Sequence, residues 1–344
     1  MKMLIVGGTF NATGGKESYF IKEIQKHFNC NAINGGTLET LYSFRPKNID
    51  VLLWMANVDN KEDKILPRLK TMNQKMLLIS SKRVIEKKYS DYELVTRAIN
   101  NKANLCLVID KTEEYVFSII DPLGNIFCDK QNLTLTLQIL NKRLNELLKV
   151  KRMPSQQVEF DAWPNSKPIS KKFVTVVKHF GKVFSKVIQA NNPKRFLGNA
   201  STRCEWGFPS QRNHTHILVS KRNVNKEAIT ESNFVKAHLA VDKILYVGNK
   251  KPSVDTPVQL ELYDKFKNIN FMLHGHCYIE NAPFTKHKIP CGDLNEVKEI
   301  INTASNLNLD FYVINLIGHG CIIMSKDIES FYKVKLLPRP LLEN

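Results

Sequence analysis

Four apolar runs of strand length recur through the first 150 residues, and helical patterns lie between several of them. Strands that alternate with helices form a mostly parallel sheet with helices on both faces. We therefore predict a doubly wound, Rossmann-like α/β domain over residues 1–150. The four runs are Lys2–Val6, Asp50–Met55, Lys75–Ser80 and Asn104–Ile109.

Residues 151–170 interrupt this pattern. They carry Pro154, Pro164 and Pro168 among polar residues and show neither the helical nor the strand period. We predict a linker here, followed by a second domain over residues 171–344. That domain also alternates helical and strand patterns, so we expect a second α/β fold.

The composition is that of a folded protein, because 43% of the 344 residues are hydrophobic. No apolar run approaches the roughly 20 residues that cross a bilayer. The N-terminus runs into an expected strand without an export signal, so we expect a cytoplasmic protein. The seven cysteines form no CxxC pair, a pattern that fits reduced thiols.

The net charge of +17 favours anionic partners, either nucleic acid or phosphorylated metabolites. The lysines are spread along the chain, and no nucleic-acid motif accompanies them. We therefore expect no nucleic-acid partner. A general compositional bias towards Lys and Asn remains an alternative source of the charge.

Two expected strands end in histidines. Phe271–Leu273 leads into His274-Gly275-His276, and Phe311–Ile317 leads into Gly318-His319-Gly320. Residues two apart on a strand point to the same face, so the first pair of rings should converge. Three imidazoles that leave one position open are typical of catalytic zinc sites. We predict a divalent metal site, with histidines paired to core carbonyls as the alternative.

Two other patterns are less specific. His214-Thr215-His216 is a second His-x-His, for which we expect an exposed strand face. The glycine-rich stretch Gly7–Gly15 follows the first strand and is predicted to be either a phosphate cradle or a tight strand-to-helix turn. Its spacing is not GxGxxG, and it has no Walker Lys-Ser pair.

From about Phe173 to Tyr332 the chain resembles the class II aldolase/adducin family. Five motifs occur in the order in which the family has them. They are Gly198–Ser201, Lys251–Pro257, His274–His276, Ile289–Cys291 and Gly318–Gly320.

This resemblance implies a class II aldolase-like α/β fold for the second domain and a homo-oligomer, often a tetramer. It implies a divalent metal, with zinc expected, on His274, His276 and His319. Family members act mostly on small phosphorylated sugars. They do so as aldolases, as a ribulose-phosphate 4-epimerase or as a thioribulose-phosphate dehydratase.

The resemblance also assigns roles to other residues. Asp255 matches the carboxylate that moves protons or ligates the metal. Gly198, Asn199 and Ser253 match positions that hold the substrate phosphate. Arg222 lies where another phosphate-binding turn of the family is expected. One departure is Val254, which stands where the family has a second serine and removes one phosphate donor.

We therefore expect a metal-dependent lyase that cleaves a small phosphorylated sugar through a metal-stabilised enediolate. A sugar-phosphate 4-epimerase is the first alternative, since the epimerase also has aspartate at the position of Asp255. A non-catalytic protein, with a nucleotide on its N-terminal domain and the second domain as scaffold, is the other.

Overall fold

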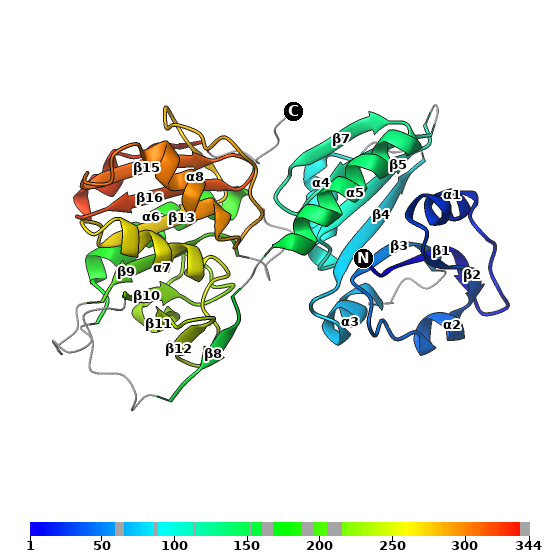
Figure 1. Cartoon of the computed structure of the whole chain (residues 1–344), viewed down its shortest axis with the longest axis horizontal. Helices are drawn as coiled ribbons and strands as arrows, with labels where there is room; N and C mark the ends of the chain where they lie inside the picture. The colour runs from blue at the N-terminus through cyan, green and yellow to red at the C-terminus, as the bar shows by residue number, and fades with distance from the viewer. Residues whose placement is uncertain are drawn as a thin grey trace. The chain divides into compact units, whose positions relative to one another are not determined.

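The chain folds into two compact units, Met1–Lys149 and a second unit that starts at Val150. The structure is a computed structural model (Figure 1). It describes residues 1–58, 65–85, 89–112, 115–150, 153–159, 168–187, 196–204 and 215–337. Each unit has its own sheet and its own buried core, so each is described by itself.

The first unit is built on a seven-stranded sheet in the order β2-β1-β3-β4-β5-β6-β7. The strands from β2 to β5 pair in parallel, and β6 and β7 add an antiparallel edge. This confirms the predicted doubly wound sheet. The strands are β1 (Met3–Asn11), β2 (Asn31–Thr37), β3 (Val51–Val58), β4 (Leu77–Val84), β5 (Leu105–Asp110), β6 (Val116–Ile120) and β7 (Ile126–Gln131).

Helices cover both faces of this sheet, because its strands bury side chains on both sides. Residues of α1 (Tyr19–Phe28) and α5 (Leu133–Lys149) share one hydrophobic cluster with the sheet. Residues of α2 (Leu38–Ser43), α3 (Ile65–Met72) and α4 (Asp91–Asn100) share the cluster on the other face. The carboxyl edge of the sheet is therefore left to the loops.

The glycine-rich stretch is partly strand, because β1 continues through Gly8 to Asn11. Gly8 has a positive φ of 78°, and a Cβ there would lie 2.6 Å from the backbone N of Gly35 on β2. The chain comes back towards β1 where Thr9 N–H donates to Lys16 O. The observed role of Gly8 is thus close packing, which favours the tight-turn interpretation.

The second unit is built on an eight-stranded sheet in the order β15-β16-β13-β9-β10-β11-β12-β8. All its pairs are antiparallel except β12 with β8. Residues 155–157, expected to belong to the linker, instead form β8. The strands are β8 (Ser155–Gln157), β9 (Asn199–Arg203), β10 (His216–Ser220), β11 (Phe234–Leu239), β12 (Ile244–Val247), β13 (Phe271–Gly275), β15 (Phe311–Leu316) and β16 (Gly320–Ser325).

Three helices pack on this sheet. Buried residues of α7 (Thr256–Lys265) and α8 (Asn295–Ala304) lie in one core with the strands. On α6 (Lys171–Val187), Phe173 packs its ring 4.9 Å from that of Phe271 on β13. A separate short pair of antiparallel strands is formed by β14 (Tyr278–Ile279) and β17 (Leu336–Leu337).

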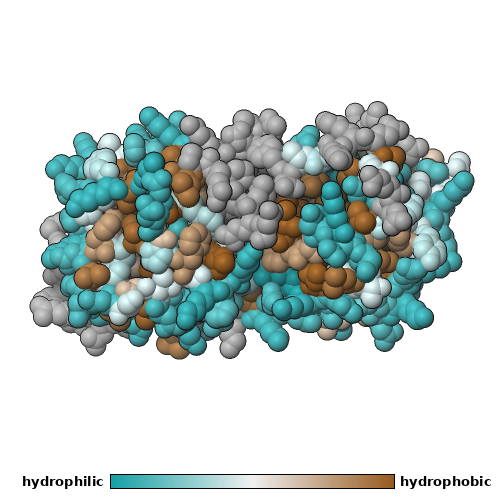
Figure 2. Space-filling view, turned by 90° about the horizontal axis from the view of Figure 1, so that it is seen from above, coloured by the Kyte–Doolittle hydropathy of each residue, from teal (hydrophilic) through white to brown (hydrophobic). Residues whose placement is uncertain are grey.

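The described surface is mostly hydrophilic on the face that Figure 2 shows, with smaller hydrophobic patches among the polar residues. Among the helices of the described residues, none is long and apolar enough to cross a membrane.

Candidate metal centre

The candidate site lies at one end of β13. This strand pairs antiparallel with β9 and with β16, so its carboxyl end meets the amino ends of both neighbours. Register places Asn199 opposite His274 on one side, and Cys321 opposite Gly275 on the other. His319 immediately precedes β16. Three segments that are far apart in the sequence therefore bring their polar residues to one place.

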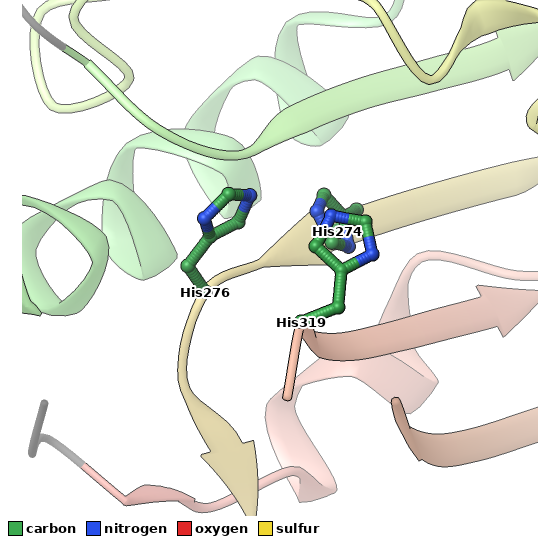
Figure 3. A group of neighbouring side chains, drawn as sticks. All are labelled: His274, His276 and His319. Atoms are coloured by element: carbon green, nitrogen blue, oxygen red, sulfur yellow. The ribbon is translucent and has the colours of Figure 1, made fainter. Parts of the chain in front are cut away.

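The structure brings the three predicted histidines together (Figure 3). The ring centroids lie 4.9 Å apart for His274 and His276, 4.6 Å for His274 and His319, and 5.1 Å for His276 and His319. One ring nitrogen from each lies within 4.8 Å of the others. All three side chains are buried. Three imidazoles gathered in this way are a candidate site for a single divalent ion.

The route to convergence differs from the prediction at His276. β13 ends at Gly275, so His276 lies beyond the strand and does not follow the strand period. Gly275 is needed because a Cβ there would lie 2.0 Å from the Phe184 ring of α6. Gly320 is needed for a similar reason, since its Cβ would lie 2.0 Å from Gly275 O. Gly320 therefore lets the two strand ends touch, and Gly275 lets α6 lie against the end of β13.

Outward hydrogen bonds fix the orientation of two of the rings. His274 Nδ1–H donates to Cys321 O at 2.9 Å, and His319 Nδ1–H donates to Glu296 Oε1 at 2.6 Å. The Nε2 atoms of both rings are buried and have no hydrogen-bond partner among the described residues. Buried imidazole nitrogens held this way are suited to bind a metal ion. The donor set therefore fits a divalent metal.

The two rings differ in charge in the metal-free protein. Burial lowers the pKa of His274 to about 4, so this ring is neutral at neutral pH. Burial also disfavours the charged form of His319, but the Glu296 carboxylate and the Cys291 side chain together outweigh it and raise the pKa of His319 well above its usual value. This raised pKa favours the form of His319 in which both ring nitrogens carry a proton.

We expect metal affinity to fall as the pH is lowered below the raised pKa of His319. The loss should be about tenfold for each pH unit, since one proton must leave for each ion bound. His274 adds no dependence near neutrality, because its pKa lies far lower. Chelator competition at a series of pH values measures this slope. Glu296→Gln should move the fall to lower pH, and an unchanged profile would contradict the assignment.

Asp255 lies beside the imidazoles at the start of α7. Its Oδ2 accepts a hydrogen bond from Asn199 Nδ2 at 2.9 Å and lies 3.9 Å from His274 Nε2. Its Oδ1 accepts from the Cys291 thiol at 3.1 Å. Burial raises the pKa of Asp255, but His274 and His319 outweigh this effect and lower it overall. The carboxylate is therefore ionised at neutral pH.

The expected phosphate-binding residues lie around the same end of the sheet. Gly198 has a positive φ of 76° and packs against His274 O, so it forms the tight turn into β9. The Asn199 side chain is buried between Asp255 and Gln259, which donates to its Oδ1. This position favours a role in orienting Asp255. Ser253 Oγ lies 3.5 Å from Asp255 Oδ2, and Arg222 is exposed with its Nε donating to Pro252 O.

Sequence patterns missed two residues of this site. Glu296 is buried on α8. The sequence feature that could have identified it is an acidic residue four positions before the core residue Ile300. Cys291 lies in the Ile-Pro-Cys motif, but nothing in the motif shows that its thiol contacts Asp255. Of the second His-x-His, His214 lies outside the described residues. His216 is buried rather than exposed, with its ring 4.8 Å from that of His238.

Residues 181–282 match the family described as Class II Aldolase and Adducin N-terminal domain. This match confirms the resemblance that the motifs indicate. It includes His274 and His276, whereas His319 lies beyond the matched residues. The matched stretch lies wholly in the second unit, which we call the aldolase-like unit.

Three solved structures are similar to parts of the chain. A sugar-phosphate aldolase from Thermotoga maritima is 14% identical over 47% of this chain and 92% of that one, with a TM-score of 0.34. An N-terminal class II aldolase domain of a Thermoplasma acidophilum protein is 17% identical over 51% and 93%, with a TM-score of 0.32. A DNA/pantothenate metabolism flavoprotein from Streptococcus pneumoniae is 12% identical over 42% and 98%, with a TM-score of 0.31.

Proposed function

We propose that the aldolase-like unit is a metal-dependent lyase that cleaves a small phosphorylated sugar between the carbons α and β to its carbonyl group. One observation carries this proposal. The nitrogens of His274, His276 and His319 converge within 4.8 Å, beside the ionised carboxylate of Asp255. In such a site the carboxylate can remove a proton from a bound substrate, and the cation can stabilise the negative charge that results.

Zinc is the metal that we propose. Imidazole nitrogens with an oxygen or sulfur neighbour are its usual ligands, and a site with three protein ligands leaves room for substrate. The bound ion would act as a Lewis acid towards negative charge that develops on substrate oxygens. Elemental analysis of purified protein tests this choice, since one zinc per chain is expected.

Asp255 would accept the proton that the substrate loses. The neighbours of Asp255 would hold its carboxylate in place. Asn199 donates to Oδ2, and Asn199 is itself fixed by Gln259 of α7. These contacts come from two elements of the core, β9 and α7, so the carboxylate is held by rigid parts of the fold. The lowered pKa of Asp255 favours its ionised form. The ionised carboxylate is the form that accepts a proton from a hydroxyl group or a carbon atom.

The 4-epimerase is the second candidate, and aspartate at position 255 favours it. Both reactions would use the same cation and the same base, so the site geometry does not separate them. Incubation of the protein with a pentulose phosphate distinguishes the two reactions. Carbon–carbon cleavage releases two shorter products, whereas epimerisation returns an isomer of the same mass. A protein that binds no divalent metal and forms neither product would be the scaffold of the remaining alternative.

We expect phosphoglycolohydroxamate to bind roughly 100-fold more tightly than its dephosphorylated form. Two charge-assisted hydrogen bonds from the Gly198 turn, Ser253 or Arg222 to the phosphate would contribute about 3 kcal/mol. Isothermal titration calorimetry measures both affinities, and inorganic phosphate should compete with the first compound. Equal affinities would remove the phosphate pocket from the proposal and leave the metal site standing.

A further inference from the structure

The loop Pro290–Asp293 lies directly on the segment that carries Asp255. Gly292 has a positive φ of 76°, and a Cβ added to it would lie 2.6 Å from Val254 Cγ1. Val254 is the residue that replaces a serine of the family pattern. Its side chain therefore packs against the loop where the family would place a phosphate donor. Cys291, the residue before Gly292 in the same loop, lies next to Asp255.

Cys291 is aimed into the candidate metal centre. Its thiol donates to Asp255 Oδ1 at 3.1 Å, and the ligand atoms of Asp255, Cys291 and His319 lie within 4.8 Å of one another. Just after this loop, α8 carries Glu296, which accepts from His319 Nδ1–H. One short segment thus supplies groups near both nitrogens of the His319 ring.

His319 is common to two possible ligand groups. It belongs with His274 and His276 in one group and with Asp255 and Cys291 in the other. Its Nε2 atom is buried and has no hydrogen-bond partner among the described residues. Because the ligand atoms of His319 and Cys291 lie within 4.8 Å of each other, an ion bound to His319 would have the Cys291 sulfur close by. Among the described residues, neither Cys277 nor Cys321 belongs to such a group, although each follows a ligand histidine.

We propose that Cys291 is the fourth protein ligand of the metal when no substrate is bound. The proposal rests on the metal site of the proposed function. As the sulfur–metal bond forms, the S–H bond would break and the proton would leave to bulk water. No oxidant or reductant takes part. The resting centre would then be closed by three nitrogens and one sulfur, and substrate would displace the sulfur.

Cobalt(II) titration of the metal-free protein tests this ligand by absorption. Visible bands report a four-coordinate ion, and near-ultraviolet charge-transfer bands report a bond between sulfur and cobalt. We expect both in the unaltered protein. Cys291→Ser should lose the charge-transfer bands and keep visible bands, because the three histidines remain. Cys204→Ser, a matched change of a partly exposed cysteine in the same unit, should keep both.

The outcomes separate this inference from the proposed function. Visible bands without charge transfer, or charge transfer that survives Cys291→Ser, would overturn the thiolate ligand and leave the histidine site intact. A protein without any cobalt bands would overturn the metal site, and with it the inference. Alkylation gives a second measure that does not need the variant. Bound zinc should slow the labelling of Cys291 and leave that of Cys204 unchanged. A Cys291 labelling rate that is the same with and without zinc would contradict the proposal.

Discussion

Replacing His276 with alanine is expected to abolish stoichiometric binding of a divalent metal. The change removes one of three converging nitrogens and leaves an ion with too few protein ligands for tight binding. His276 lies in a loop just beyond β13, so the sheet itself should keep its pairing. Metal content after dialysis, measured by elemental analysis, gives the result, and circular dichroism verifies the fold.

His287→Ala is the matched control, because this exposed histidine is hydrogen-bonded to Glu299, away from the three converging histidines. It should retain one ion per chain. His319 is a poorer position for the same experiment. Removing its ring would leave Glu296 buried without its partner, which typically costs about 3–5 kcal/mol. Unchanged zinc content in His276→Ala would show that the metal is bound elsewhere or not at all.

Asp255→Asn is expected to lower turnover by about 10²–10⁴-fold, with a much smaller effect on KM. The amide has nearly the same shape and can still accept the hydrogen bond from Asn199. It cannot accept a proton at neutral pH, and so it cannot serve as a base. Steady-state kinetics on the cleaved sugar phosphate, once it is found, measure kcat and KM separately.

Asp310→Asn provides the control, since this exposed carboxylate pairs with Lys326 on the surface. Its kinetic constants should be those of the unaltered enzyme. Near-normal turnover in Asp255→Asn would reduce Asp255 to a structural residue at the start of α7. Loss of bound metal in the same variant would instead identify it as a ligand, which the elemental analysis used for His276→Ala also detects.

The convergence of the three histidines could be predicted from the sequence, because each of them stands at the end of a strongly apolar run. Such runs define strands by composition alone, and the sheet then brings strand ends together. The parallel order of the first unit was predictable for the same reason. The short strand β8 was not, because Ser155–Gln157 is polar and pairs only through its backbone with β12.

The sequence also did not predict the site residues that tertiary contacts bring to the histidines and to Asp255. Glu296 contacts His319 from α8, which packs on the same sheet, and Cys291 contacts Asp255 from a loop that packs against Val254. Neither contact leaves a periodic signal in the sequence. Asn199 has contacts that its motif did not indicate, because its side chain lies between Asp255 and Gln259. The phosphate contact that the motif predicted stays a prediction.

The strand order of the second unit also sets when the centre can form during synthesis. β13 lies next to β16, although α8 and β15 come between them in the sequence. The ribosome therefore delivers His274 and His276 well before His319. Until β16 docks beside β13, the nascent chain has two of the three imidazoles and lacks the nitrogen shared by both ligand groups. On the proposed metal site, capture of the ion would therefore be a late event, because the third histidine is synthesised last.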